Sequence, residues 1–394
     1  LCELNAIYVQ NYHISMKKLI FKKFASDWIK SFILSILSAS IIIWVIQAVN
    51  FLDVVTEDGH GLKVYFLYTL MTLPKILSKI LPFVFFISLI SVISKYENNN
   101  ELLIFWTNGI NKLTLVNFVL LISTFFMLTQ LILNVLIVPT TQDKARSFIR
   151  SSNLDFFEQI IKEKKFVDTV KDLTIFIEKK EEDGSLKNVL LKDDLNKNNF
   201  QIIIAKSGRF VIDSTKKVIV LYNGKILNKN QDKITEIDFV ETEFNISKFT
   251  TKSVVDRKTQ EVNSFDLVMC IYLSQNLDRS EINTLANVNK FDNCRLENFN
   301  NIRQEIYKRF AMPIYIFLLA TIGILIVLKS KDEFKYTRYK ILIFLYGMFI
   351  IIFGEMSQEL INENLYNNIL VALIPIVILI FNYIFISNNI LKLE

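Results

Sequence analysis

The segment ENNNELLIFWTNGINK, residues 97–112, lies between two long apolar runs. A simple loop between two membrane spans would be polar, but this one holds five consecutive apolar residues, Leu102 to Trp106, before it stops at Gly109. Asn98 to Asn100 can supply an N-cap, and Glu101 suits the positive end of a helix dipole. Gly109 can take the left-handed position that ends a helix. We therefore predict a short capped helix over residues 98–109.

A helix this short with a continuous apolar run has more than one face to bury. One face can pack under the chain's own helices, and the other face then needs a partner. The alternative interpretation is that Phe105 and Trp106 only anchor the segment at the lipid headgroups, where aromatic side chains are common.

The apolar residues on both sides of this segment gather in long runs. A run of about 18 or more apolar residues with few charges is a candidate transmembrane helix. Five of the runs reach that length and one falls just short; together they are 31–52, 65–94, 113–139, 306–328, 341–357 and 368–387. Residues 140–300 have the composition of a soluble domain. We predict an α-helical membrane protein with six transmembrane helices, three before and three after one inserted domain.

Basic residues decide the predicted orientation, because loops rich in Lys and Arg stay in the cytoplasm. The loops 53–64 and 358–367 are acidic, so we expect them and residues 140–304 to face outward, with both termini cytoplasmic. Residues 1–15 precede Met16, a more natural start, and we interpret them as a start-site extension. The basic residues that face the cytoplasm in this scheme are Lys17, Lys18, Lys22, Lys23, Lys30, Lys329, Lys331, Lys335, Arg338 and Lys340.

Residues 166–247 change to short strand-like runs separated by turn signals. Asp183-Gly184 and Asn223-Gly224 lie between apolar runs, where such pairs predict hairpin turns, and Ser207-Gly208 predicts another break. Several short strands at this spacing predict an antiparallel sandwich, jellyroll or partly open barrel. Its apolar side chains either fill the domain's own core or line an open cleft for a lipid. Residues 250–304 are interpreted as a return segment with one amphipathic helix at FDLVMCIYL.

The sequence contains no motif that predicts catalysis. It has no G-x-x-x-x-G-K-[ST] phosphate loop, no G-x-S-x-G elbow, and no H-E-x-x-H or paired-cysteine zinc pattern. With 2 histidines, a histidine-based metal site or triad is nearly excluded, so we predict no catalytic residue, metal or cofactor. The net charge of +6 is spread along the chain and gives no nucleic-acid footprint. Cys270 and Cys294 share the predicted outer compartment, where they could pair or remain two thiols.

Charged residues within the apolar runs are few. The centres of spans one, three, four and six hold none, which disfavours an ion-coupled transporter. Lys75 and Lys79 in the second run are four residues apart and therefore share a helix face. Because residues 76–94 suffice to cross the bilayer, these lysines are expected near the outer headgroups. They either snorkel to the interface or meet an anionic lipid headgroup.

Several segments together resemble the LptF/LptG permeases of bacterial lipopolysaccharide export. NNNELLIFWTNGINK is similar to the family's Ser-Glu-Leu segment with its following glycine, with Glu101 and Gly109 in place. EIYKRFAMPI (305–314) is similar to the family's Glu-Leu-x-x-Arg-x-Ala-x-Pro pattern at span four. LTIFIEKKEEDGSLKNVLLKDD (173–194) and AKSGRF (205–210) resemble its first hairpin and one of its strands, and WVIQAVNFLDVV (44–55) is closer to the LptF side. The resemblance covers nearly the whole chain from Met16 onward.

The resemblance implies a fold and a mechanism. It implies a periplasmic antiparallel β-jellyroll domain within 140–304, between transmembrane parts 16–139 and 305–394. It further implies a permease subunit that pairs with an LptG-like paralogue, sits on two copies of an LptB-like ATPase, and passes lipopolysaccharide to LptC- and LptA-like proteins. The short helix would then be the coupling helix that docks in a groove of the ATPase, with contacts from Glu101, Leu102, Phe105, Trp106 and Gly109.

The sequence also departs from the family. A basic residue near the outer end of span one, which meets lipid phosphate in the family, corresponds here to Asn50. Phosphate contact would then come from other cations, or the lipid would differ; the candidates are Lys75, Lys79, Lys308 and Arg309, of which the last two could also be interfacial anchors. Two alternatives remain open. One is the LptG-like partner subunit, and the other is a membrane-anchored periplasmic binding or scaffold protein without transport activity.

Overall fold

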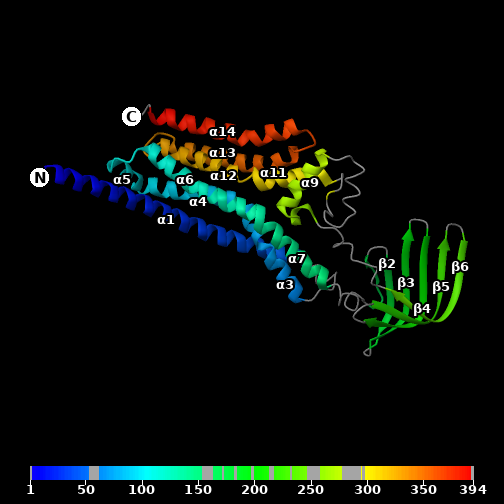
Figure 1. Cartoon of the computed structure of the whole chain (residues 1–394). Coiled ribbons are helices and arrows are strands. Elements are labelled where there is room, and N and C mark those ends of the chain that lie inside the picture. The colour runs from blue at the N-terminus through cyan, green and yellow to red at the C-terminus, as the bar shows by residue number, and fades with distance from the viewer. Residues whose placement is uncertain are drawn as a thin grey trace. The chain divides into compact units, whose positions relative to one another are not determined.

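The computed structural model describes residues 2–52, 62–152, 163–170, 173–181, 184–196, 199–212, 217–230, 233–245, 258–276, 294 and 298–391. The chain divides into two compact units. The first contains Leu1–Val45, Thr72–Asp143 and Lys258–Glu394, and the second contains Ile46–Met71 and Lys144–Arg257. The first unit is a helical bundle, and the second carries a β-sheet (Figure 1).

Helices account for most of the described residues outside the sheet. The first half of the chain contains α1 (Cys2–Asn50), α3 (Leu62–Met71), α4 (Leu73–Asn98), α5 (Glu101–Thr107), α6 (Lys112–Ile132), the π-helix η1 (Leu133–Ile137) and α7 (Val138–Ser152). After the sheet follow the 3₁₀ helix η3 (Thr259–Glu261), α9 (Ser264–Asn276), α11 (Phe299–Phe310), α12 (Ile314–Ile324), η5 (Leu325–Leu328), α13 (Tyr336–Ser357), η6 (Gln358–Leu360) and α14 (Leu365–Leu391).

Five helical segments among the described residues are long and apolar enough to cross a membrane: Met16–Asn50, Leu62–Asn98, Lys112–Phe148, Tyr336–Leu360 and Leu365–Leu391. Phe299–Phe310 and Ile314–Leu328 add a sixth if they form one span with a bend of 47°. Pro313 lies at this bend, where its missing N–H group and its ring interrupt a helix. The predicted helical membrane protein is thus confirmed with five or six spans, and the layout of three plus three remains a prediction.

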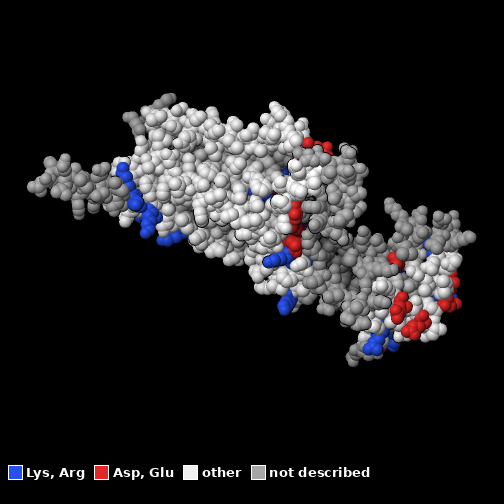
Figure 2. All heavy atoms as spheres, in the orientation of Figure 1, with Lys and Arg blue, Asp and Glu red and all other residues white. Residues whose placement is uncertain are grey.

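Helix α12 forms the centre of the bundle. It packs against α4, α6, α13 and α14, and most of its side chains are buried. A helix that is apolar all round must be covered on all sides, which matches its central place in Figure 1. Figure 2 shows the surrounding bundle surface almost free of charge, with Lys and Arg gathered over the first part of α1. This is the surface expected of helices that meet lipid.

Glycines and aromatic rings fix how the bundle helices approach each other. Trp28 of α1 is fully buried, and its indole N–H donates to Ser88 Oγ of α4 over 3.2 Å. Gly347 of α13 faces the ring of Phe86 on α4, and a Cβ atom at this glycine would overlap the ring. Helices without a side chain at the crossing point can approach closely, which favours tight packing in membrane bundles.

The sheet of the second unit is an antiparallel meander with strand order β1-β2-β3-β4-β5-β6. Its strands are β1 (Phe166–Val170), β2 (Leu173–Lys180), β3 (Ser185–Asn196), β4 (Asn199–Ile212), β5 (Lys217–Asn230) and β6 (Lys233–Asn245). The predicted turn at Asp183-Gly184 is confirmed, since Gly184 between β2 and β3 has φ +80°. The antiparallel β domain is confirmed as well, and the two-sheet jellyroll remains a prediction.

Two other predicted turns are wrong. Ser207-Gly208 lies inside the 14-residue strand β4, and Asn223-Gly224 lies inside the 14-residue strand β5. The positive φ that favours a turn is present at Asn223 (52°), but there it bends one strand instead of joining two. Asn188 of β3 has the same conformation, with φ 50°.

These positions form a crease across the sheet. The residue pairs on either side of them align Asn188 of β3, Lys206 of β4 and Asn223 of β5 in one row. Side chains of a regular strand alternate between faces, yet Leu186 and Val189 of β3 are both buried in the same core. The strand therefore turns over between them. Figure 1 shows that the strands are curved, as such a turn in the middle of a strand requires.

The described part of the return segment belongs to the bundle and not to the β unit. Residues Lys258–Glu394 fall in the first unit, and the second unit extends to Arg257. The predicted outer region 140–304, which combines the β domain with the return segment, remains a prediction. The predicted helix is confirmed as α9, but it is not amphipathic, because large apolar side chains such as Phe265, Val268 and Tyr272 are exposed on its open face. Cys270 of α9 forms a disulfide with Cys294, and both pack with Leu267, Phe299 and Ile302. This bond resolves the two alternatives left open for these cysteines.

Candidate functional site

Helix α5 ends as predicted and begins differently. Gly109 has φ +66°, its N–H donates to Trp106 O over 3.0 Å, and the Ile110 N–H donates to Phe105 O over 3.0 Å. This pair of bonds is the Schellman motif that closes a helix. At the start, Asn100 occupies the N-cap position as predicted, but it adopts φ 58° and its side chain does not make the expected capping bond. The residue is instead used for its tolerance of the left-handed conformation.

The buried face of α5 packs on the bundle. Leu102 and Phe105 are 1% and 2% exposed. The Phe105 ring contacts the rings of Phe21 and Phe24 on α1 at centroid distances of 5.9 and 6.2 Å. Two of the predicted coupling residues therefore hold the helix on its own chain. A continuous apolar run cannot show which side chains face inward, because that depends on the angle at which α5 meets α1.

The opposite face of α5 is open. Leu103 and Ile104 are 58% and 51% exposed, although both are large and apolar. Trp106 lies between the two faces, packed partly against the bundle core and 5.8 Å from the ammonium of Lys112. Leu103 and Ile104 are residues that the sequence-based site did not include, and they form the surface that a partner can reach.

Glu101 is bonded within the chain. Its carboxylate accepts from Lys23 Nζ of α1 over 3.3 Å and from Asn99 Nδ2 over 3.1 Å. The Lys23 side chain is 65% exposed, and such solvent-exposed ion pairs stabilise a fold by only about 0–1 kcal/mol. This pair leaves the Glu101 carboxylate near the surface at the end of the bundle where α5 lies.

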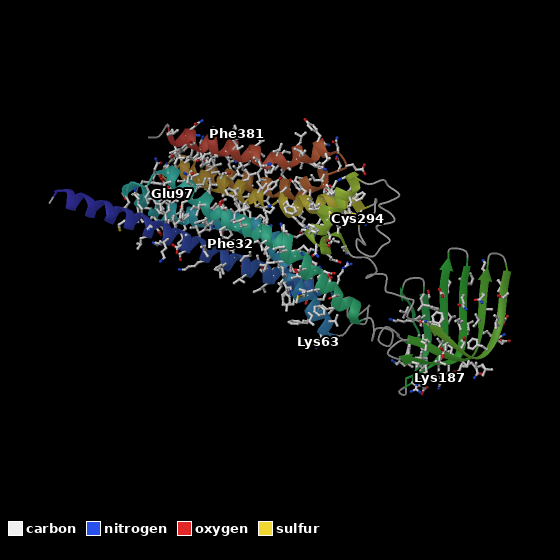
Figure 3. The ribbon with its side chains drawn as sticks, viewed as in Figure 1. Phe32, Lys63, Glu97, Lys187, Cys294 and Phe381 are labelled. Carbon is white, nitrogen blue, oxygen red and sulfur yellow. A yellow bond between two sulfur atoms is a disulfide. The ribbon has the colours of Figure 1, made fainter. Side chains whose placement is uncertain are left out.

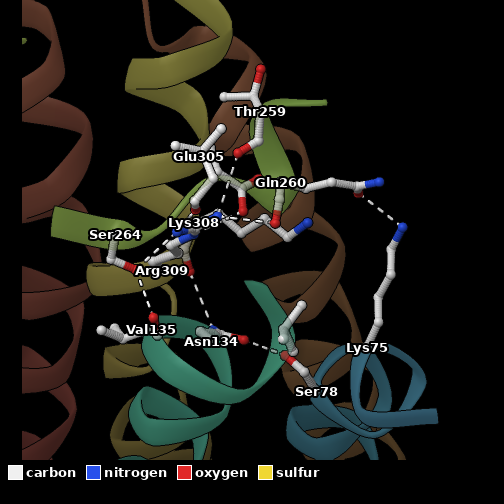
Figure 4. A network of polar contacts seen from close by, with 12 residues as sticks. Lys75, Ser78, Asn134, Val135, Thr259, Gln260, Ser264, Glu305, Lys308 and Arg309 are labelled. Carbon is white, nitrogen blue, oxygen red and sulfur yellow. Dashed lines mark hydrogen bonds and ion pairs between the residues drawn. The ribbon is translucent and has the colours of Figure 1, made fainter. Parts of the chain in front are cut away.

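At the other end of the bundle, Arg309 of α11 is a buried structural clamp (Figure 4). It is 1% exposed, and each of its five N–H donors has an acceptor within the chain. Nε donates to Glu305 Oε1 at 3.0 Å, Nη1 to Val262 O and Ser264 Oγ at 2.8 Å each, and Nη2 to Gln260 O at 3.1 Å and Thr259 O at 3.5 Å. No donor remains for a lipid phosphate, so Arg309 is not among the lipid contacts proposed below.

Unlike Arg309, the lysines near this clamp are exposed or half-buried. Lys75 of α4 donates to Gln260 Oε1 over 2.9 Å (Figure 4). The charges of Lys79, Lys258 and Lys308 act on Lys75 as well. Lys79 and Lys258 are exposed, and Lys308 is half-buried. The structure thus brings together three of the sequence-predicted lipid residues and adds Lys258. Asn50 is exposed at the last residue of α1, in the second unit.

A set of buried amides connects this clamp to the middle helices. Asn134 lies in the π-helix η1, bonds to Ser78 Oγ, and donates to Lys308 O over 3.4 Å. Gln130 Nε2 donates to Ser78 O over 3.0 Å. Ser264 Oγ donates to Val135 O over 2.7 Å, which extends the network to the π-helix backbone. The sequence does contain a signal for this network: Gln130 and Asn134 lie within an apolar run. A polar side chain buried in such a run needs a hydrogen-bond partner from another segment.

The β unit carries a groove of about 630 Å³ along its crease. Phe176, Leu190 and Ile204 contribute apolar side chains, and Lys206, Lys225 and Asp238 contribute charged ones. The hydrogen bond with Glu236, with the nearby charge of Asp238, raises the pKa of Lys225 and keeps it cationic. Because Lys225 is paired with Glu236 and Asp238, the apolar side chains are the part of the groove open to an apolar ligand. It is open to solvent, in contrast to the filled core on the inner face.

Bundle and sheet together define a class: a multi-pass membrane protein with an antiparallel β unit. Among the described residues, no group of three or more His, Cys, Asp or Glu side chains could hold a metal ion. Comparison with known families then identifies the chain. Residues 23–389 match the family described as lipopolysaccharide export system permease LptF/LptG, and the chain belongs to this family. It is therefore a transport permease of the inner membrane and not itself an enzyme.

One curated relative is similar along nearly its whole length. An uncharacterized protein of Rickettsia prowazekii (strain Madrid E) is 23% identical over 367 residues, which cover 89% of this chain and 95% of that protein. The match includes both the helical bundle and the β unit, so the two units occur together in that protein's sequence as well.

Proposed function

We propose that the chain is the LptF-like permease subunit of an ABC-type lipopolysaccharide exporter. It would extract the lipid from the outer leaflet of the inner membrane and pass it to a periplasmic protein bridge. The observation that carries this proposal is helix α5, which is fixed to the bundle by Leu102 and Phe105 but presents Leu103 and Ile104 to solvent. A permease that is driven by another protein needs such a rigidly held external contact.

The energy source would be a separate chain. The sequence has no phosphate-binding loop, so nucleotide hydrolysis would occur on LptB-like ATPase subunits, two per complex. An LptG-like paralogue would complete the membrane part, and LptC- and LptA-like proteins would receive the lipid. Family membership supports each of these partners.

The lysines around Arg309 are the proposed contacts for the phosphate groups of the lipid. Lys75, Lys79, Lys258 and Lys308 lie on three segments of one unit, and the carboxylate of Glu305 beside them is already paired with Arg309. A phosphate oxygen would therefore meet a net positive site. The groove of the β unit is the proposed second contact, for an acyl chain.

The proposed orientation agrees with this arrangement. The end of the bundle that carries α5 would be cytoplasmic, and the β unit and the lysine cluster would be periplasmic. The disulfide between Cys270 and Cys294 supports this assignment, because disulfides persist in the bacterial periplasm and are rare in the cytosol.

Co-purification with candidate ATPases tests the proposal. The wild-type protein should capture one ATPase, and Leu103→Asp with Ile104→Asp should abolish capture. Leu365→Asp with Tyr366→Asp is a matched control, since these side chains are 59% and 69% exposed at the first residues of α14, before the apolar run of that span begins. A wild-type protein that captures no ATPase would favour a scaffold role instead.

Charge exchange at Glu101 separates two roles of this residue. Glu101→Lys should weaken capture. If Lys23→Glu restores capture in the double variant, then Glu101 acts through its bond to α1. If capture stays weak, then Glu101 contacts the partner directly.

A further inference from the structure

The connection between η5 and α13 is bonded to the end of α4, just before α5 begins. The main-chain N–H of Lys331 donates to Glu97 Oε1 over 2.7 Å, and Lys331 Nζ donates to Asn98 O over 3.2 Å. Glu97 and Asn98 are the last residues of α4, directly before α5, and Figure 3 shows Glu97 at this end of the bundle. Segments more than 230 residues apart in sequence are thus held together.

The connection is itself an ordered turn. The Ser330 N–H donates to Glu333 Oε1 over 3.1 Å, and the Tyr336 N–H donates to Glu333 O over 3.2 Å. Lys335 adopts the left-handed conformation with φ 70°, and its ammonium lies 5.2 Å from the centre of the Phe334 ring. Phe334 is held out at the tip of this turn and is 87% exposed.

We propose that residues 329–335 form the second half of the docking surface that begins with α5, and that Phe334 inserts into an apolar pocket of the same partner. This inference rests on the proposed function of α5. Phe334, Leu103 and Ile104 are large apolar side chains exposed at one end of the bundle, on two segments that Lys331 ties together. In many protein interfaces a few residues that become buried in pockets of the partner, aromatic side chains among them, contribute most of the binding energy.

The charges around Phe334 indicate the chemistry of the partner. Lys329, Lys331, Lys335, Arg338 and Lys340 surround the aromatic residue in sequence, so the matching surface is an apolar pocket edged by carboxylates. The main competing occupant is the anionic surface of the membrane. Asp332 and Glu333 directly precede Phe334 and are exposed, which opposes insertion among anionic headgroups and favours a protein.

Glu97 has a positioning role in this arrangement. Its carboxylate accepts from the Lys331 main chain, so it sets where the turn lies relative to α5. If movement of the partner displaces α5, this bond would transmit the displacement to α13, the helix that follows the turn. Glu97→Gln keeps an acceptor at this place and Glu97→Leu removes it, which makes the two variants a matched pair.

Site-specific photocrosslinking in the intact protein tests the proposal. Benzoylphenylalanine would replace Leu103, Phe334 or, as a control, Tyr366, which is 69% exposed at the start of α14. We expect the candidate ATPase to crosslink at positions 103 and 334 and not at 366. Crosslinking at 103 with only lipid or nothing at 334 would overturn this inference and leave the proposed function intact. No crosslink at 103 would count against the proposed function, and the inference would fall with it.

Affinity measurements give a second readout that does not depend on crosslinking. Phe334→Ser should weaken ATPase binding by about tenfold or more, as expected for loss of an aromatic anchor, whereas Tyr366→Ser should leave it unchanged. Glu97→Leu should weaken it similarly and Glu97→Gln should largely restore it. Wild-type affinity in Phe334→Ser would contradict the proposal.

Discussion

Arg309, Lys75 and Lys79 are cations near one end of the bundle, but their surroundings give them different roles. The guanidinium of Arg309 bonds three backbone carbonyls, one hydroxyl and one carboxylate. Lys75 donates a hydrogen bond to Gln260 Oε1, and Lys79 is exposed. We therefore expect loss of Arg309 to affect folding and loss of the lysines to affect lipid binding.

Replacement of Arg309 should destabilise the fold. Arg309→Met leaves the Glu305 carboxylate and several carbonyls without their donor, a loss of about 3–5 kcal/mol for a broken buried pair. Arg309→Lys should recover little, because an ammonium cannot reach acceptors on several sides as the guanidinium does. Thermal unfolding in detergent measures this effect. Arg303→Met on the same helix is the control, since Arg303 bonds only to Asn300 at 3.4 Å in the described contacts. Wild-type stability of Arg309→Met with impaired lipid binding would contradict the structural role.

Replacement of the lysines should weaken binding of phosphorylated lipid. Lys75→Met with Lys79→Met removes two donors to anionic oxygens, each worth about 1.5–3 kcal/mol when bonded to a charged group. Because about 1.4 kcal/mol corresponds to a tenfold change in affinity, we expect the affinity for lipopolysaccharide to fall at least tenfold. The affinity for a dephosphorylated lipid should change little. Lys17→Met with Lys18→Met on α1 serves as the charge-matched control. Equal losses for both lipids would show that the phosphate is not the group recognised.

At the scale of elements, the crease decides the shape of the β unit. Asn223 holds a left-handed backbone in the middle of β5, which costs a residue with a branched Cβ about 1–2 kcal/mol. Asn223→Val should lower the unfolding temperature of the sheet, and Asn223→Gly should not. Asn228→Val is the matched control on the same strand. Circular dichroism of the intact protein on heating measures this unfolding temperature. An unchanged unfolding temperature in Asn223→Val would mean that position 223 tolerates a branched side chain and that the crease is not strained.

The contact between α4 and α13 should be equally sensitive to a single methyl group. Gly347→Ala places a Cβ atom within the Phe86 ring, and such overpacking costs about 1–3 kcal/mol. Gly354→Ala on the same helix meets Tyr315 at 3.0 Å and should be tolerated better. Phe86→Leu should rescue Gly347→Ala, so that the effects of the two changes are not additive. Additive losses in detergent stability would contradict a direct contact.

For the whole molecule, the sequence predicts elements better than it predicts their contacts. Apolar runs locate the spans because the bilayer demands about 20 apolar residues, and Asp183-Gly184 marks its turn correctly. The same rule for Asn-Gly and Asp-Gly pairs wrongly predicts a turn at Asn223-Gly224. A residue with positive φ can bend one strand as well as join two strands. It also gives no access to the five acceptors of Arg309 or to the bond from Lys331 to Glu97, because these depend on residues brought together only by the fold.

The proposed function makes this chain the membrane part of an ATP-driven lipopolysaccharide exporter. The most direct measurement is lipopolysaccharide transfer from proteoliposomes that contain the chain, its paralogue and the captured ATPase, to an added periplasmic acceptor protein. We predict transfer that requires ATP and that is lost with Leu103→Asp and Ile104→Asp but kept with the α14 control variants. Transfer that proceeds equally without ATP, or an assembled complex that moves no lipid, would contradict the account.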